Sequence, residues 1–176
     1  MANLRKLIRY DLPLHIVLRL TNWLPDNVSV IRLRGRLAAP FFKSCGKRLG
    51  LGRNITFYNP SGLDIGDDVY IAYGCWFNAT GGIQIADEVL FGPYGVVVTS
   101  NHTKTAHSYR FGPSRIEPIT IGKGSWIAAH VTILAGVNIG EGVLVAANSV
   151  VNKSVVNHQI VGGVPAKVLR DENNEK

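Results

Sequence analysis

Cysteine is scarce in this chain of 176 residues, where Cys45 and Cys75 are the only two. They form no Cys-x-x-C motif and no dense framework, which argues against disulfide bonds and against a structural zinc site built on cysteines. Long apolar runs are also lacking, because charged residues between Arg5 and Arg19 interrupt the N-terminal apolar pieces before they reach the length of a membrane span or a signal-peptide core. We therefore expect a cytoplasmic protein in a reducing compartment.

Glycine, by contrast, is frequent, with 19 residues, and 46% of the chain is hydrophobic while 18% is charged. The chain also contains six Phe, six Tyr and three Trp, so neither collagen nor disorder fits the composition. A length of 176 residues suits one compact domain and leaves little room for two independent cores.

The net charge of +7 is concentrated at the N-terminal end. Residues 1–53 contain eleven Lys/Arg and two Asp/Glu, whereas residues 54–176 contain eight Lys/Arg and ten Asp/Glu. A basic stretch such as Arg-Leu-Arg-Gly-Arg-Leu at 32–37 suits an anionic membrane surface or a phosphate-bearing substrate. The alternative is a helical cap that packs its apolar residues on the main body and leaves its charges in water. No helix-turn-helix, zinc or RNA-binding signature accompanies the charge, so we expect no nucleic-acid partner.

An aliphatic or aromatic residue returns at every sixth position from residue 65 onwards. The step is interrupted by one insertion of two residues and by one long break. The position after each of these anchors is mostly small, and four positions after each anchor comes another small or β-branched residue. The anchors are Ile65, Ile71, Phe77, Ile85, Phe91, Val97, Ile121, Ile127, Ile133, Ile139, Val145 and Val151.

A period of six is neither that of a helix nor that of simple strand alternation. It fits a short strand followed by a sharp corner, and three such faces close a triangular coil whose anchors stack inward on one another. Six residues at about 3.3 Å each limit a face to about 20 Å, so the interior admits one layer of aliphatic side chains. A β-sandwich with regular strands is the alternative, but it does not require this register. We predict an all-β protein, a parallel β-helix with a partly helical, basic cap over residues 1–50.

The repeat breaks after Val97, and residues 103–118 are polar, with two Pro, one Gly, aromatic residues and charges. We expect a loop that protrudes from the coil, which is where binding and chemistry tend to occur. His102 stands at its root. A histidine held there by the coil can act as a general base on a bound hydroxyl, and a surface or loop-packing role is the alternative from position alone.

Several segments, together with the hexad register, resemble the hexapeptide-repeat acyltransferases over residues 51–170. The similarity is greatest to the branch that contains maltose and galactoside acetyltransferases and the O-acetyltransferases of bacterial surface polysaccharides. The segments are Thr-Ser-Asn-His-Thr (99–103), Pro-Ile-Thr-Ile-Gly and Ser-Trp-Ile (118–127), Ile-Leu-Ala-Gly-Val (133–137) and Gly-Gly-Val-Pro-Ala-Lys-Val (162–168). The resemblance implies a left-handed β-helix as the catalytic domain over 51–170, with a polar tail at 171–176, and a homotrimer with active sites between subunits.

The resemblance also implies the chemistry. Acetyl-CoA is the expected co-substrate, no metal is expected, and a sugar hydroxyl attacks the thioester directly while His102 takes its proton. The expected acceptor-binding residues are Asn78, Asn101, Tyr109, Arg110 and Glu117. Glu117 is also a candidate to orient His102, because it closes the loop that His102 opens, and a solvated loop charge is the alternative. The implied coenzyme-binding residues are Trp126, Ala128, Ala146, Asn152, Lys153, Lys167 and Arg170.

The chain departs from the family pattern at two places. Asn152-Lys153 replaces the usual Thr-Lys before the last coil, which puts coenzyme contacts there in doubt. Ala135-Gly136 replaces the usual Pro-Gly and is expected to change only a corner.

Other interpretations stay open. A related trimeric β-helix class, the γ-class carbonic anhydrases, binds zinc or iron through three histidines, for which His102, His107 and His130 are the candidates here. A structural or assembly subunit without turnover is a second possibility. Within the enzyme class, an amino sugar or a small amino acid would give N-acylation instead. The basic first third leads to the hypothesis that the protein approaches the inner face of the cytoplasmic membrane, where a lipid-linked sugar would be presented.

Overall fold

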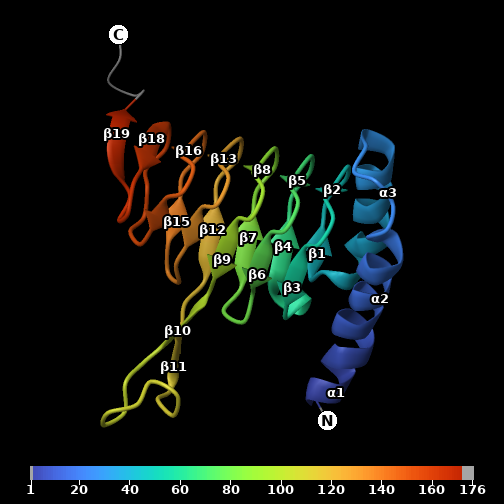
Figure 1. Cartoon of the computed structure of the whole chain (residues 1–176), viewed down its shortest axis with the longest axis horizontal. Coiled ribbons are helices and arrows are strands. Elements are labelled where there is room, and N and C mark those ends of the chain that lie inside the picture. The colour runs from blue at the N-terminus through green and yellow to red at the C-terminus, as the bar shows by residue number, and fades with distance from the viewer. Residues whose placement is uncertain (1, 172–176) are drawn as a thin grey trace.

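The computed structural model describes residues 2–171, which form a helical cap followed by a three-sided parallel coil (Figure 1). The first three helical pieces follow one another without a break and form one rod, because the residues that join them keep right-handed helical backbone angles. A further helix and a short 3₁₀ turn lead into the coil. The cap comprises α1 (Ala2–Lys6), the π-helical turn η1 (Leu7–Asp11), α2 (Leu12–Thr21), α3 (Val28–Ala38) and η2 (Ala39–Phe41).

The strands of the coil form three parallel sheets over the described residues, here called sheets A, B and C. Sheet A contains β1 (Ser44–Cys45), β4 (Leu63–Ile65), β7 (Ile83–Ile85), β12 (Ile119–Ile121) and β15 (Asn138–Ile139). Sheet B contains β2 (Gly50–Leu51), β5 (Tyr70–Ile71), β8 (Leu90–Phe91), β13 (Trp126–Ile127), β16 (Leu144–Val145), β18 (Gln159–Gly162) and the antiparallel β19 (Lys167–Asp171). Sheet C contains β3 (Thr56–Tyr58), β6 (Trp76–Asn78), β9 (Val96–Val98), β14 (Thr132–Ile133) and β17 (Val150–Val151), and η3 (Pro60–Gly62) joins β3 to β4.

The predicted anchors form the core of this coil, which confirms the parallel β-helix. Ile121 pairs with Ile139 in sheet A, Ile127 with Val145 in sheet B, and Ile133 with Val151 in sheet C. All twelve anchors are buried, so each coil packs its side chains on those of the next.

The coil begins one turn earlier than the repeat predicted. Cys45, Leu51 and Phe57 keep the six-residue step and pair in register with Ile65, Ile71 and Phe77, respectively. The first strand therefore starts at Ser44, inside the stretch assigned to the cap. The expected tail at 171–176 lies outside the described residues except for Asp171.

The cap is held to the coil by apolar packing and by one buried cation. Leu14 and Leu18 of α2 belong to the same buried cluster as the anchors. The Arg34 side chain is fully buried and donates to Asp26 Oδ1 at 3.0 Å and to the carbonyl of Leu51 at 2.6 Å. A Cβ at Gly35 would lie 1.9 Å from the carbonyl oxygen of Leu49, so glycine is required where α3 approaches the coil. Arg34, the middle of the three arginines in the basic stretch, therefore contributes to the packing of the cap on the coil.

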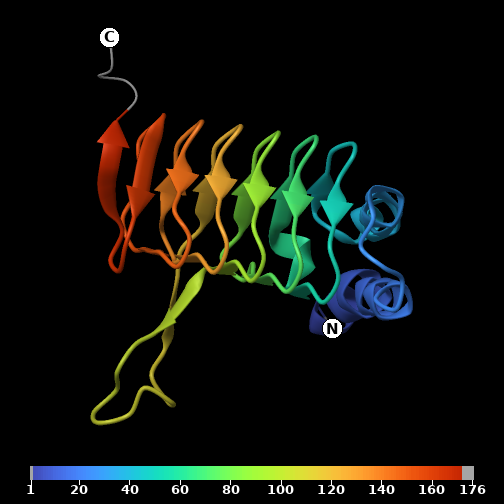
Figure 2. The same ribbon diagram turned by 45° about the horizontal axis from the view of Figure 1, so that its top comes forward.

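The long break in the repeat is a two-stranded arm rather than an unpaired loop. Strands β10 (Ser100–His102) and β11 (Ser114–Ile116) pair antiparallel and project from the corner where sheet C passes to sheet A, here called the C–A corner (Figure 2). The arm therefore leaves the coil at Ser100, before the expected start at residue 103. Both cysteines are free, and none of the described helices is long and apolar enough to cross a membrane.

Candidate active site

Asn78 fastens the arm to the coil at the C–A corner. It ends strand β6, and its Nδ2 donates to the hydroxyl of Ser100 at 3.0 Å, at the first residue of the arm. Its Oδ1 accepts from the backbone N–H of Thr80 at 3.1 Å and from the hydroxyl of Thr80 at 2.6 Å. This Asx turn orients the amide, so the arm leaves the coil from a defined position. The Asn-x-Thr spacing is the sequence signal for Thr80, which the sequence interpretation missed.

Glu117 closes the arm at the same corner. Its N–H donates to the carbonyl of Thr99 at 2.9 Å, and its Oε1 accepts from Arg115 at 2.7 Å. The carboxylate lies over the next coil, because a Cβ at Gly136 would come within 3.1 Å of its Oε2. The ion pair with Arg115 engages this carboxylate, so the residue expected to orient His102 has another partner in this chain.

His102 lies on β10 and pairs with Ser114 on β11, while the neighbouring Asn101 pairs with Arg115. Both His102 and Asn101 are exposed. Because successive strand residues point to opposite faces, these two expected site residues occupy different faces of the arm. The imidazole is therefore presented to solvent on a hydrogen-bonded strand, which fixes the position of its backbone.

Tyr109 and Arg110 lie beyond the pairing of β10 with β11, toward the tip of the arm. The N–H of Arg110 donates to the hydroxyl of Ser108 at 3.1 Å, and the Lys104 ammonium lies 5.9 Å from the centroid of the Tyr109 ring. Figure 2 shows this tip projecting well away from the coil. Within one chain, Asn78 and Glu117 therefore lie at the root of the arm, whereas Tyr109 and Arg110 lie toward its tip.

Three of the residues expected to bind the coenzyme lie on or directly after strands of sheet B. Trp126 is on β13 between Leu90 and Leu144 of the neighbouring strands, and it is 47% exposed. Ala128 and Ala146 directly follow β13 and β16, two neighbouring strands of this sheet. These residues form a platform on one coil face.

The other residues expected to bind the coenzyme divide between two places. Lys167 and Arg170 are on β19, the antiparallel strand at the end of sheet B. Asn152 and Lys153 are exposed and follow β17 of sheet C, where the chain turns toward sheet A. One chain alone therefore does not bring these four expected coenzyme-binding residues together on one face.

The same separation applies to His102 and Trp126. In a three-sided coil, the C–A corner lies opposite sheet B, so the arm and the indole belong to opposite sides of one chain. The candidate catalytic and coenzyme-binding residues thus do not form one pocket within a single chain.

The three histidines considered for a metal site are also apart. His130 is at the corner between sheets B and C, where its ring stacks on Tyr94 with centroids 4.9 Å apart. His107 lies beyond β10 in the arm, and His102 is on β10 itself. Within residues 2–171, no three His, Cys, Asp or Glu side chains lie together in a way that could hold a metal ion.

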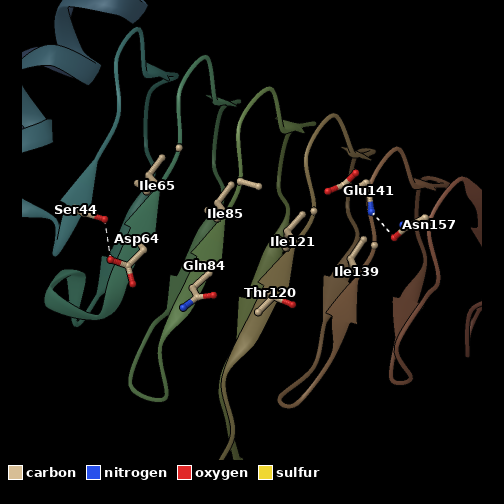
Figure 3. Close-up of a pocket in the computed structure, with 14 residues that line it drawn as sticks. Ser44, Asp64, Ile65, Gln84, Ile85, Thr120, Ile121, Ile139, Glu141 and Asn157 are labelled. Carbon is tan, nitrogen blue, oxygen red and sulfur yellow. Dashed lines mark hydrogen bonds between the residues drawn. The ribbon is translucent and has the colours of Figure 1, made fainter.

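A shallow groove runs along the outer face of sheet A, which the sequence interpretation did not foresee (Figure 3). The Ser44 hydroxyl donates to Asp64 at 2.8 Å, and the N–H of Glu141 donates to Asn157 at 3.0 Å. Burial acts to raise the pKa of Asp64, but hydrogen bonds from Lys43 and Ser44 and the charge of Lys43 bring it below its usual value. The groove offers hydrogen bonds but contains no histidine among its lining residues.

The three-sided coil, which the arm interrupts, is similar to that of proteins built on hexapeptide repeats. Residues 118–153 match the family model described as bacterial transferase hexapeptide (six repeats). WbbJ of Escherichia coli (strain K12), a protein named for O-acetyl transfer in lipopolysaccharide biosynthesis, is 30% identical over 145 residues, which cover 77% of this chain and 70% of WbbJ. The chain belongs to this hexapeptide-repeat acetyltransferase family.

Further similar sequences and structures also belong to acetyltransferases. The galactoside O-acetyltransferase of Escherichia coli (strain K12) is 33% identical over 135 residues, covering 77% of this chain and 60% of the relative. The crystal structure of a maltose O-acetyltransferase from Clostridium difficile 630 superimposes with a TM-score of 0.82 at 26% identity, covering 94% of this chain and 87% of that one. The chain spans 65% of the length of several curated relatives from Staphylococcus aureus.

Proposed function

We propose that this protein transfers an acetyl group from acetyl-CoA to a sugar hydroxyl. The observation that carries this proposal is the exposed His102 on a hydrogen-bonded arm that projects from a coil of the acetyltransferase family. An acetyltransferase of Vibrio cholerae O1 biovar eltor with this fold, at a TM-score of 0.79 and 29% identity over 90% of this chain and 85% of that one, has been solved in complex with acetyl-CoA.

The proposed reaction is a direct transfer. The acceptor oxygen forms a bond to the acetyl carbon as an imidazole nitrogen of His102 takes the hydroxyl proton. The bond between that carbon and the coenzyme sulfur breaks, and the proton held by His102 passes to the departing thiolate. No covalent bond to the enzyme is needed. The two cysteines have no role in this step, and both are buried or half-buried.

The coenzyme is proposed to lie along sheet B. Trp126 offers an exposed aromatic surface, and the small side chains of Ala128 and Ala146 leave room beside it. Lys167 and Arg170 at the end of this sheet supply positive charge for the phosphates, since ammonium and guanidinium groups suit phosphate oxygens.

A homotrimer would unite the two halves of the site. The arm of one subunit would lie against sheet B of its neighbour, and a three-fold axis would repeat this contact three times in a closed assembly. The support is the position of His102 and Trp126 on opposite sides of one chain. In such an assembly, Asn152 and Lys153 at the C–A corner would approach the neighbour's Lys167 and Arg170.

The acceptor is proposed to be a sugar unit of a cell-surface polysaccharide. At the root of the arm, Asn78 and Glu117 offer amide and carboxylate groups that suit sugar hydroxyls, and Asn101, Tyr109 and Arg110 extend this polar surface along the arm. The name of WbbJ, which refers to lipopolysaccharide biosynthesis, supports this class of acceptor.

The test is a screen of nucleotide sugars, oligosaccharides and lipid-linked glycans with acetyl-CoA, read by mass spectrometry and by release of free coenzyme thiol. The expected result is one acetyl ester on a sugar hydroxyl, which mild base removes. An acetyl amide, which mild base leaves in place, would contradict the O-acetyl assignment. Coenzyme binding without acetyl transfer to any acceptor would favour a structural role and contradict the proposal.

A further inference from the structure

The helical cap carries a row of exposed apolar side chains, here called the outer stripe. Its members recur at every fourth position along the rod, and an exposed tryptophan follows the end of α2. Because residues four apart lie on the same face of a helix, the row is continuous. The outer stripe consists of Leu4, Ile8, Leu12, Ile16, Leu20 and Trp23.

The coil leaves this stripe uncovered, because it uses the other side of the rod. Leu14 and Leu18 are the residues of α2 that join the buried core, and they do not belong to the four-residue series of the stripe. Leu20 is 65% exposed and Trp23 79% exposed. A helix that is apolar on two opposite faces has a second surface to bury, and adjacent exposed apolar residues of this size mark an interaction site.

The charges of the cap are those that an anionic partner requires. Of the two acids in the cap, Asp11 is half-buried, and Asp26 is paired with Arg34 and Arg53. The exposed basic side chains of the cap are Arg5, Lys6, Arg9, Arg19, Arg32 and Arg36.

We propose that the outer stripe and these basic side chains dock the protein on an anionic phospholipid bilayer. The apolar side chains enter the boundary between head groups and acyl chains, while the Arg and Lys side chains contact lipid phosphates. Trp23 lies at the end of the stripe, where an indole suits the region between water and hydrocarbon. A second copy of the chain would bury the apolar residues but would repel the clustered positive charge.

The start of the cap lies next to the C–A corner, from which the candidate catalytic arm projects. Lys6, Leu7 and Asp11 line one cleft with residues of the C–A corner, including Thr80. Thr80 is bonded to Asn78, and Asn78 is bonded to Ser100 of the arm. Figures 1 and 2 show α1 and the arm on the same side of the coil. Docking would thus bring this corner close to the bilayer. If the proposed acetyl transfer is correct, the acceptors within reach include sugars linked to membrane lipids.

The experiment is flotation of the full chain with two kinds of vesicle, phosphatidylcholine alone and phosphatidylcholine mixed with phosphatidylglycerol. The expected result is recovery with the anionic vesicles, little with the neutral ones, and a decrease as salt is added, because salt screens the charge attraction. Equal recovery with both kinds of vesicle, or with neither, would overturn the proposal.

Matched variants distinguish binding through the outer stripe from nonspecific hydrophobic binding to the vesicles. Ile16→Glu combined with Leu20→Glu should abolish flotation, while Val156→Glu, at a 61% exposed apolar position of the coil, should not change it. Arg19→Gln, next to Leu20 of the stripe, should weaken binding to anionic vesicles about five-fold, and Lys123→Gln on the coil should leave it unchanged. Thermal unfolding of each variant verifies that it is folded.

Sedimentation of the same variants tests whether a second copy of the chain covers the outer stripe instead. If the double variant changes the oligomeric state and the unchanged protein does not float, the stripe is an interface between chains and the bilayer proposal is wrong. Flotation requires no acceptor or coenzyme. A protein that floats but transfers no acetyl group would therefore contradict the proposed function alone.

Discussion

His102 carries the proposed reaction, and a second histidine in the same arm provides its control. His102 is on the paired strand β10, whereas His107 lies further out and is also exposed. We predict that His102→Ala lowers kcat about 10²- to 10⁴-fold, the usual contribution of a general base, while coenzyme binding persists. His107→Ala should stay near the activity of the unchanged protein. Steady-state kinetics and calorimetric titration with CoA measure the two effects, and near-normal turnover of His102→Ala would remove the assignment.

The two cysteines are predicted to be unreactive. Burial, with a smaller effect from the charge of Asp67, raises the pKa of the Cys45 thiol to about 11, and burial raises that of Cys75 to about 11. Both groups are therefore protonated at neutral pH, and the thiolate is the reactive form. Titration with Ellman's reagent at pH 8 should show slow labelling of the folded protein and rapid labelling of two thiols after denaturation. Fast labelling of either thiol in the folded state would contradict this environment.

Arg34 is predicted to be the most sensitive of the basic residues in the cap. Its guanidinium is buried against Asp26 and the carbonyls of Leu51 and Thr21. Arg34→Ala removes these three hydrogen bonds, one of which joins the cap to the coil, while Asp26 keeps Arg53, and it should lower the free energy of unfolding by about 3 kcal/mol. Arg36→Ala, exposed on the same helix, should stay within about 0.5 kcal/mol. Urea unfolding followed by circular dichroism compares them, and equal stability of the two variants would contradict the role of Arg34.

At the scale of elements, the arm is separable from the coil. Thr103 donates to the carbonyl of Pro113 at 3.0 Å at the outer end of the antiparallel pair, so a two-residue Asn-Gly turn can replace residues 104–112 without altering the pairing of His102 with Ser114. The shortened arm should leave the thermal midpoint nearly unchanged, because the anchors on either side, Val97 and Ile121, remain buried. It should lower kcat/KM for the acceptor at least about ten-fold through loss of Tyr109 and Arg110.

The measurement is a thermal melt beside acceptor kinetics. An Ala106→Ser variant with the full arm is the control, since it changes an exposed position outside the proposed site. If the shortened arm kept full activity, the acceptor would have to bind at the root alone.

For the whole molecule, the proposed trimer leads to a complementation test. His102→Ala removes the base from one side of each site, and Trp126→Ala removes the platform from the other side. When the two inactive proteins are unfolded, mixed in equal amounts and refolded together, one site in three of each mixed trimer, or about one quarter of all sites, receives both intact residues. Activity should therefore return to about a quarter of that of the unchanged protein.

Each variant refolded alone is the control and should remain inactive. Light scattering should give the mass of three chains. A mixture without activity, despite mixed trimers, would show that one chain supplies both residues.

The periodic part of the sequence was sufficient to predict the coil. Anchors such as Ile121 and Ile127 keep a six-residue step because each strand and corner has nearly the same length, and that geometry is local. The sequence repeat did not reveal the first turn of the coil, because Cys45 is a weak anchor and a two-residue insertion at η3 separates Phe57 from Ile65. The arm was predicted as a break in the repeat, but its strand pairing was not, because its short strands carry no alternation of apolar and polar residues.

The sequence by itself determined the three-sided coil, the helical character of the basic cap and the family, since each of these follows from local spacing or from short motifs. Tertiary structure alone decided which side chains meet: that Glu117 pairs with Arg115, that Arg34 is buried while Arg36 is exposed, and that His102 and Trp126 lie on opposite sides of one chain. The reason is that a period of six determines which residues point inward. How the corners, the arm and the cap are placed relative to one another depends on contacts between residues far apart in the chain.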